Sequence, residues 1–415
     1  MSKQRIFSNY QIFMIAILAF IQFTVILDFM VLSPLGAILL PELDITTKQF
    51  GWVVSGYAFS AGISGILAAG FADKFDRKKL LMFFYVGFIV GTAFCASATN
   101  YHFLLLSRIF TGIFGGVIGS IGFAIITDIF ALEVRGRVMG FTQMAFAASQ
   151  ILGLPIGLYL ANEFGWHAAF WMIVIVGSVV GLIIFIYMKP INSHLEANSG
   201  QNPIKHLWST VTNTDYVKVF LSTTLLATGG FMLMPFGSAF STNNLGISLD
   251  DLPLLYGVTG VFTIIFGPVL GKVADKLGKL KLFIAGSILS MILVGIYCNL
   301  GITPLWAIMI LNVVLFIGIN ARMISASALI TAIPDLKDRG AFMSINSSVS
   351  QVSGGIASTI AGMIISQRAD GMLENYPMLG WVVIASMIIS AFLMIVINNL
   401  VDKRAEAAKA ISVIP

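Results

Sequence analysis

Long apolar stretches alternate with short polar interruptions along the whole chain. Cutting at charged residues and at clusters of Pro, Gly and Asn gives apolar segments near residues 11–38, 49–72, 79–98, 102–128, 136–162, 166–188, 216–240, 253–274, 280–299, 303–331, 339–366 and 378–400. Each is close to the roughly 20 residues that a helix needs to cross a hydrocarbon core about 30 Å thick. We therefore predict an all-α integral membrane protein with twelve transmembrane helices.

Composition and charge support the membrane assignment. Hydrophobic residues make up 58% of the chain and charged residues only 10%, whereas soluble domains carry charge on about 25% of their residues. The net charge of +5 does not indicate nucleic-acid binding, because most basic residues lie in the interruptions after even-numbered spans or near the termini. The positive-inside rule therefore predicts a multi-pass protein of the cell membrane with both termini cytoplasmic.

The longest polar interruption divides the predicted spans six plus six. We expect an N-terminal six-helix bundle over residues 1–188, a cytoplasmic linker over 189–215, and a C-terminal six-helix bundle with a short cytoplasmic tail over 216–415. Landmarks recur between the halves at nearly constant offset, Asp73 with Asp275 and Arg135 with Arg339. Two parallel repeats are typical of transporters whose substrate site lies at the membrane midplane between the halves.

One carboxylate, Asp28, cannot be moved out of an apolar span by any reasonable segmentation. A charged group at that depth is costly and usually lines a polar cavity or takes part in proton transfer. Arg108 lies in the fourth span at a depth from which its long side chain could reach Asp28. Burial and a guanidinium act on a carboxyl pKa in opposite directions, so such a pair is either a proton-coupling site or a fixed structural ion pair.

Other polar residues at span depth are candidates for a substrate cavity. Arg322, in the tenth span, has no counterpart at the repeat offset; it could bind an acidic group of a substrate, snorkel to the surface, or pair with Asp335 or Asp338. Polar side chains of this kind also hydrogen-bond across helices as packing contacts. The remaining candidates for the cavity are Gln22, Tyr57, Gln143, Gln150, Asn346 and Gln351.

Residues 69–78 read Ala-Gly-Phe-Ala-Asp-Lys-Phe-Asp-Arg-Lys and are similar to the Gly-x-x-x-Asp-Arg-x-Gly-Arg-Lys signature of the major facilitator superfamily. The chain resembles that family over essentially its whole length, which implies two six-helix pseudo-repeat bundles. The resemblance implies a cytoplasmic gate in which Asp73 meets the start of span eleven and Arg77 pairs with Asp128. Asp275 is the second-half copy of Asp73. The signature is imperfect, because Lys74 and Asp76 depart from it.

Further stretches resemble motifs of drug:proton antiporters with twelve spans. The Arg108 segment carries the expected glycines, Gly112, Gly115 and Gly116. In span five Gly153, Pro155 and Gly157 resemble an antiporter motif whose terminal double glycine is reduced here. Leu27-Asp28 followed by Pro34-Leu35 resembles the span-one pattern of the same branch. Together these motifs indicate export rather than uptake.

The chain lacks the sequence signatures of the common catalytic and cofactor sites. It has no phosphate-binding Gly-Lys-Ser/Thr loop, its four His residues are scattered, and no nucleophile–base pair is apparent. We therefore expect neither an enzyme nor a bound cofactor or metal, with the proton as the coupling ion.

The sequence predicts proton-coupled efflux, by antiport and alternating access, of small lipophilic or amphipathic organic compounds. We expect a monomer whose partners are its small-molecule substrate and membrane lipid, without nucleic acid. Two alternatives stay open: uptake or exchange of a sugar, metabolite or organic anion, and translocation of a lipid or lysolipid.

Overall fold

The protein is described from a computed structural model that covers residues 7–68, 74–192, 203–335 and 338–412. The helices of the N-terminal half are α1 Asn9–Val31, α2 Gly36–Glu42, α3 Thr47–Ala68, α4 Arg77–Ala96, α5 Tyr101–Ile129, α6 Leu132–Ala148, the π-helix η2 Ser149–Gly153, α7 Leu154–Phe164 and α8 His167–Tyr187.

The second half has the same plan with added short elements. Its elements are α10 Pro203–Thr212, α11 Thr214–Leu233, η3 Met234–Phe236, α12 Gly237–Asn243, η4 Leu249–Asp251, α13 Leu252–Leu277, α14 Lys279–Tyr297, α15 Leu305–Ile330, α16 Arg339–Ile364, β1 Ser366–Gln367, β2 Leu373–Glu374 and α17 Tyr376–Ser412. The two strands pair antiparallel in a small hairpin.

Local sequence explains where several helices begin and end. Asp76 and Asn100 accept hydrogen bonds from the backbone N–H groups of Lys79 and Phe103, which caps α4 and α5. Gly278 has a positive φ of 93° and separates α13 from α14, a conformation that residues with a Cβ rarely adopt.

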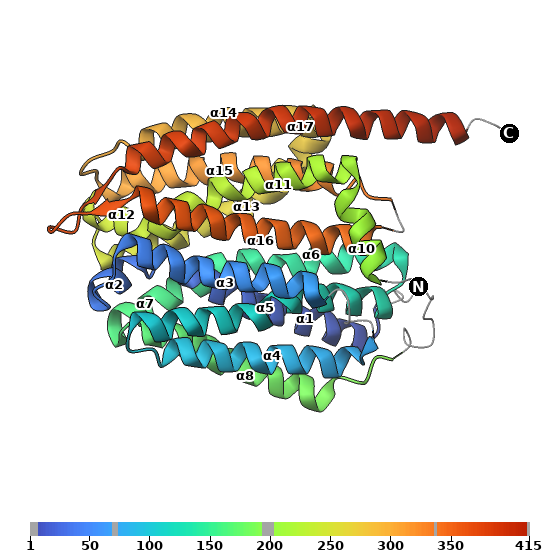
Figure 1. The fold of residues 1–415 in the computed structure, drawn as a ribbon, viewed down its shortest axis with the longest axis horizontal. Helices are drawn as coiled ribbons and strands as arrows, with labels where there is room; N and C mark the ends of the chain where they lie inside the picture. Colours follow the sequence, from blue (N-terminus) through green and yellow to red (C-terminus); the bar gives the residue numbers. More distant parts are fainter. Residues whose placement is uncertain (1–6, 69–73, 193–202, 336–337, 413–415) are drawn as a thin grey trace, which may run out of the picture.

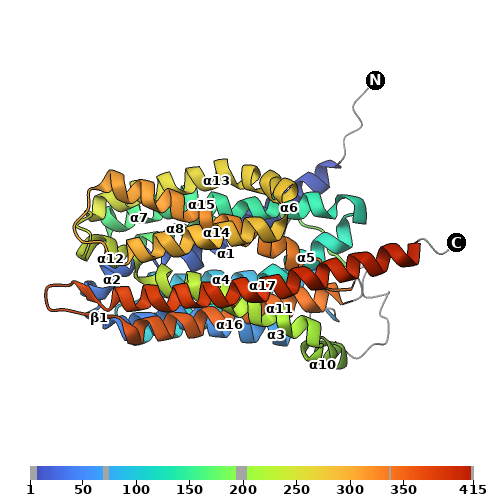
Figure 2. The ribbon, with the colours of Figure 1, turned by 90° about the horizontal axis from the view of Figure 1, so that it is seen from above.

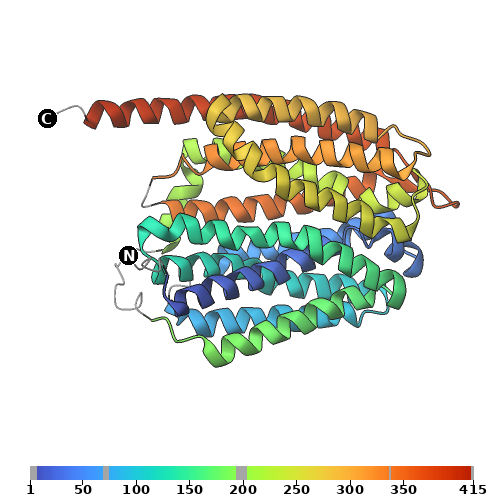
Figure 3. The same cartoon turned by 180° about the vertical axis from the view of Figure 1, so that it is seen from behind.

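The helices run side by side along the long axis of the molecule (Figure 1). α1 begins and α17 ends at one end, which we call the terminal side (Figures 1 and 3). The opposite end carries α2, α12 and the β1–β2 hairpin, and we call it the hairpin side (Figures 1 and 2).

Among the described residues, eleven helical segments are long and apolar enough to cross a membrane. The predicted eleventh span corresponds to α16, which is long enough at 26 residues but does not belong to that apolar set. Its sequence is rich in Ser, Asn, Gln and Gly, and its polar side chains bond to both α11 and α3, as Asn346 does to Thr223 and Thr359 to Ser55. The predicted span positions otherwise agree with the helices to within several residues.

Two segments differ from the predicted outline. The linker over 189–215 contains a helix, α10, because Pro203–Thr212 has apolar residues on one side of a helical turn. α17 continues to Ser412, beyond the predicted end at residue 400, since the residues that follow include the strong helix formers Ala, Glu and Lys.

The two halves meet along two seams. The first is the long contact of α3 with α16, where small residues bring the backbones together: a Cβ on Gly51 would lie 2.9 Å from the carbonyl oxygen of Ser358. Ser55 Oγ donates to the carbonyl of Gly355 at 2.8 Å. The second seam joins α7 and η2 to α13, where a Cβ on Gly260 would lie 2.9 Å from Ile151.

Additional contacts join the halves on the hairpin side. Ser33 Oγ donates to the carbonyl oxygen of Met234, and Ser238 Oγ donates to the carbonyl oxygen of Ser33 at 3.1 Å. α2 packs against α12 nearby. These contacts join the halves on the hairpin side.

Candidate functional site

A buried ion pair joins α1 and α5 inside the N-terminal half. Arg108 Nη1 lies 2.7 Å from Asp28 Oδ2, and the two side chains are 1% and 0% exposed. Thr92 Oγ1 of α4 donates to the other carboxylate oxygen, Asp28 Oδ1, at 3.0 Å. The structure thus brings together the two proton-coupling candidates, and it adds Thr92, which sequence reasoning did not single out.

Tyr57 covers the guanidinium from α3. The Arg108 Cζ atom lies 4.5 Å from the centre of the Tyr57 ring, a cation–π distance. Two glycines allow this approach: a Cβ on Gly115 would lie 2.5 Å from Tyr57 Oη, and one on Gly112 would overlap Ser60 and the Tyr57 backbone. Tyr57, predicted as a cavity residue, therefore belongs to the ion-pair site.

The arrangement balances one buried cation against one buried anion. Removing either charge from water costs several kcal/mol, which is offset only when partners are close and hydrogen-bonded. Asp28 has both oxygens bonded, while the Nε of Arg108 has no hydrogen-bond partner among the described residues. The guanidinium is the member of the pair that keeps its charge in proteins.

The antiporter-like segment of span five packs against α1 next to this site. A Cβ on Gly153 would lie 2.5 Å from Leu27, and one on Gly157 would lie 3.2 Å from Val31. Pro155 lies on the other side, 3.5 Å from the position of a Cβ on Gly257 of α13. The three residues therefore lie in tight contacts between α1 and the second half.

The π-helix η2 immediately precedes these glycines. Ser149 Oγ donates to the carbonyl of Phe23 at 3.1 Å. Gln150, a cavity candidate, is 8% exposed, and its Oε1 has no hydrogen-bond partner among the described residues. Its backbone lies 3.2 Å from the position of a Cβ on Gly260, so this residue lies at the seam with α13, and π-helical turns occur often at functional sites. No pattern in the sequence predicted the π-helix.

The other cavity candidates are dispersed. Gln22 borders a small cavity between α1, α4, α5 and α6, together with Ile118 and Thr142. Asn346 Oδ1 accepts a hydrogen bond of 2.6 Å from Thr223 within the C-terminal half. Gln351 is half-buried on α16, and the side chain of Gln143 lies outside the described residues. The structure therefore does not gather these side chains into one site.

Arg322 is buried inside the C-terminal half, 5% exposed. Its stem packs where a Cβ on Gly286 of α14 would lie, and its Cζ is 5.5 Å from the Phe283 ring. Nε and Nη2 have no hydrogen-bond partner among the described residues. The loop acids considered as its partners, Asp335 and Asp338, bind elsewhere.

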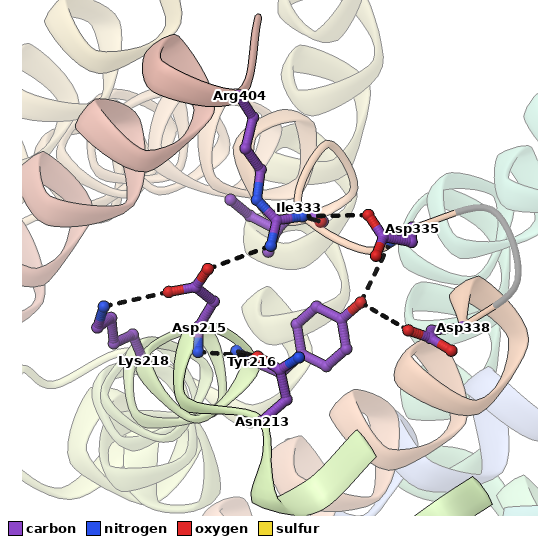
Figure 4. A network of polar contacts seen from close by, with 8 residues as sticks. All are labelled: Asn213, Asp215, Tyr216, Lys218, Ile333, Asp335, Asp338 and Arg404. Carbon is purple, nitrogen blue, oxygen red and sulfur yellow. Dashed lines mark hydrogen bonds and ion pairs between the residues drawn. The ribbon is translucent and has the colours of Figure 1, made fainter. Parts of the chain in front are cut away.

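A polar network on the terminal side of the C-terminal half was not predicted (Figure 4). Arg404 of α17 pairs with Asp215 at 3.1 Å and with Asp335 at 3.4 Å. Tyr216 donates to Asp338 Oδ2 at 3.0 Å. The network joins α11, α17 and the residues before α16, so Asp335 and Asp338 are occupied and do not pair with Arg322.

The described residues of the predicted gate lie at the terminal side. Arg77 Nε lies 3.0 Å from Asp128 Oδ2, the contact that the family resemblance implied. Asp73 lies outside the described residues, and Asp275 is exposed near the end of α13. Asp76, at a position where the family signature has glycine, accepts from the backbone N–H of Ile191 at 2.9 Å and thereby holds the start of the linker against α4.

Comparison with known proteins identifies the fold. The sequence model of the Major Facilitator Superfamily matches residues 18–235 and again 219–412. The uncharacterised MFS-type transporter YceJ of Bacillus subtilis (strain 168) is 28% identical over 271 residues, 65% of this chain and 68% of YceJ. Multidrug resistance protein 3 of the same organism is 30% identical over 146 residues, 35% of this chain and only 28% of that protein.

Solved structures share the architecture at low identity. A bacterial homologue of the human lysosomal transporter Spinster, in an inward-facing and occupied conformation, has a TM-score of 0.69 at 17% identity and covers 96% of this chain and 98% of its own. The nucleoside transporter NupG has a TM-score of 0.71 at 13% identity, with coverage of 93% and 99%. These likenesses concern the fold.

Proposed function

This chain belongs to the major facilitator superfamily, and we propose that it is a proton-coupled exporter of small lipophilic or amphipathic organic compounds. It is a multi-pass membrane transporter with the fold of this superfamily of secondary transporters. The proposal adds the coupling ion, the direction and the substrate class, and it places the protein in the cell membrane with both termini cytoplasmic.

The buried Asp28–Arg108 pair carries the proposal. A proton that enters from outside the cell neutralises Asp28 and weakens its attraction to Arg108. The guanidinium stays charged and keeps the Tyr57 ring as its neighbour. When the halves rearrange and the site opens to the cytoplasm, renewed attraction to Arg108 favours release of the proton. One acid that loads on one side and unloads on the other drives antiport when protonation and substrate binding exclude each other.

The gate follows from the contacts between the halves. In this conformation the hairpin side is closed by α2, α12 and the Ser33–Met234 contact. With the terminal side as the cytoplasmic side, substrate enters from the cytoplasm. The opposite state requires closure of the terminal side, where the Arg77–Asp128 pair lies at the start of α4. Asp73 would then meet the positive N-terminal end of α16.

The substrate class rests on two observations. The side chains packed next to the ion pair, such as Leu27, Met30 and Val31, are mainly apolar, and a pathway that opens between them suits lipophilic cargo. The partial similarity to multidrug resistance protein 3 agrees with such cargo. We expect the protein to work as a monomer in contact with membrane lipid.

The test uses purified protein in vesicles with an imposed pH gradient and a lipophilic dye as probe. Asp28→Asn should abolish gradient-driven dye export, because the amide cannot bind and release a proton. Exchange of dye at equal pH should continue, since it does not require net proton movement. If gradient-driven export by Asp28→Asn equals that of the parent protein, the assignment of Asp28 as the proton carrier is wrong.

One observation favours a second function, exchange of an organic anion. Arg322 is a buried guanidinium with two nitrogens unpartnered among the described residues, and such a group has unused capacity for an acidic ligand. In this case a labelled carboxylate should show counterflow that does not respond to the pH gradient. Arg322→Ala should abolish it, while Asp28→Asn should leave it intact.

A further inference from the structure

Three aromatic rings form an unbroken path from the ion pair to the second half. Tyr57 of α3 covers the Arg108 guanidinium. The centre of its ring is 5.4 Å from that of Phe29 on α1, and Phe29 is again 5.4 Å from Phe231 on α11. Such spacings are those of directly packed aromatic pairs. The path therefore crosses from the N-terminal to the C-terminal half.

Phe231 is firmly seated at the far end of the path. A Cβ on Gly354 of α16 would lie 2.5 Å from the Phe231 ring, so the ring occupies the space that only a glycine leaves free. Ser358 Oγ, from the next turn of α16, donates to the carbonyl oxygen of Phe231 at 3.0 Å. Any displacement of this ring must therefore move α11 relative to α16 or change the ring's rotamer.

The same two helices continue directly into the closed hairpin side. Phe29 follows Asp28 in the chain, and Ser33 lies about one turn further on. Phe231 is followed by Met234, whose carbonyl oxygen accepts the hydrogen bond from Ser33. The aromatic path and the hairpin-side closure are thus successive contacts between the same pair of segments, residues 28–33 and 231–234.

We propose that Phe231 is a positioning residue that couples the charge state of the Asp28–Arg108 pair to the closure of the hairpin side, through the rings of Phe29 and Tyr57. The inference rests on the proposed proton coupling. It extends that proposal by naming the connection between the proton site and one of the two gates.

The physical basis is close packing. When a proton neutralises Asp28, Arg108 loses its ionic partner, and the face of Tyr57 becomes its main attraction. A guanidinium that moves toward the Tyr57 ring changes the space that is available to that ring. In an interior packed at crystal density, Tyr57, Phe29 and Phe231 cannot move independently. The packing of the Phe231 ring against Gly354 therefore changes with the charge at Asp28.

Few ionisable groups compete with Asp28 for this role. The ionisable side chains that face it are Arg108, Tyr57 and Cys95, from α5, α3 and α4. α6, α7 and α8 also pack on α1. Their described charged residues lie near helix ends, as Arg137 of α6 and Glu163 of α7 do.

The test follows the hairpin side with one spin label on each half. Glu42 and Asp250 are exposed there, and Cys replacements at both positions carry the labels in full-length protein in lipid. In the parent the distance between labels should differ between acidic and alkaline pH. In Phe231→Ala that difference should vanish. Infrared difference spectra should still show protonation of Asp28, identified by its loss in Asp28→Asn.

A matched control removes an aromatic ring that also packs on α16. Phe59 of α3 lies 2.9 Å from the position of a Cβ on Gly355, next to Gly354, but within the described part of the chain it has no ring contact with the path. Phe59→Ala should keep the pH-dependent distance, and Phe231→Tyr should restore it. Gradient-driven export should fall about tenfold in Phe231→Ala, a typical size for coupling between sites, while exchange at equal pH should persist.

The outcomes separate the two proposals. A pH-dependent distance in Phe231→Ala equal to that of the parent, or an equal loss in Phe59→Ala, overturns the coupling role of Phe231 and leaves the proton site standing. If the parent itself shows no titration of Asp28, the proposed function fails first and the coupling role fails with it.

Discussion

In the N-terminal half the arginine inside a span meets a carboxylate, whereas in the C-terminal half the arginine inside a span meets an aromatic ring. Arg108 pairs with Asp28 at 2.7 Å and lies over Tyr57. Arg322 lies over Phe283 and has two nitrogens without a partner among the described residues. The halves are repeats of one fold, yet among the described residues a fully buried ion pair is found in the first half only.

The comparison also extends to packing. α5 approaches α3 so closely that glycines are required beside Tyr57, whereas several glycines of the second half, such as Gly230, would place an added Cβ more than 4 Å from any other described group. The glycines beside Tyr57 are therefore required by the contact that covers the ion pair. The second half contains more buried hydroxyls without partners among the described residues, Ser222, Ser290, Ser325, Tyr376 and Ser390.

The largest expected effect comes from breaking the paired side. Asp28→Ala leaves the Arg108 charge buried without compensation, and we expect a loss of about 3–5 kcal/mol in the free energy of unfolding. Arg108→Met should cost less at acidic than at alkaline pH, because a proton can neutralise the stranded carboxylate. Thermal unfolding of both variants in detergent, at acidic and at alkaline pH, measures these losses. Equal losses at both pH values would show that the pair is not electrostatically coupled.

A second contrast concerns the glycines. Gly112→Ala should cost about 1–3 kcal/mol, since the added methyl overlaps Ser60 and the Tyr57 backbone and overpacking forces the helices apart. Gly230→Ala, in open space on α11, should be stabilising by about 0.5–1 kcal/mol because Ala restricts the unfolded chain. Unfolding midpoints of the two variants should therefore move in opposite directions from that of the parent.

In the C-terminal half, removal of the Arg322 charge should raise the free energy of unfolding. Arg322→Met keeps the packing against Gly286 and Phe283 and removes two buried nitrogens that lack partners among the described residues, so we expect a gain of about 1 kcal/mol. Arg322→Lys, which keeps a charge, serves as the control and should not gain. A loss as large as that of Asp28→Ala would instead mean that Arg322 has an anionic partner in another state.

The smallest effect is expected at the exposed network of Figure 4. Arg404 is 33% exposed, and Asp335 is 62% exposed. Arg404→Ala should therefore cost at most about 1 kcal/mol, and the difference from the parent should shrink at high salt. A loss that does not change with salt would contradict an electrostatic role and indicate lost packing of α17 instead.

The helices could be predicted well from the sequence because crossing a membrane requires long apolar runs, whose ends are marked by charges. The same pattern placed Asp28 and Arg108 at depths that allow them to meet. Thr92, Phe29 and Phe231 were not predicted, because their roles depend on how each helix is rotated about its own axis. The π-helix and the Arg404 network depend on tertiary contacts that no local pattern records.

The seam between α3 and α16 has a consequence for how the protein is made. Thr47 Oγ1 donates to the carbonyl of Ile365, 318 residues further along the chain. During synthesis α3 is inserted long before α16 exists. Until then the small and polar residues of α3 that contact α16 in the folded protein are exposed to lipid or to the insertion machinery. α16, less apolar than its neighbours, then enters against a surface already suited to receive it. Truncation before α16 should therefore leave a nascent chain that cellular quality control recognises.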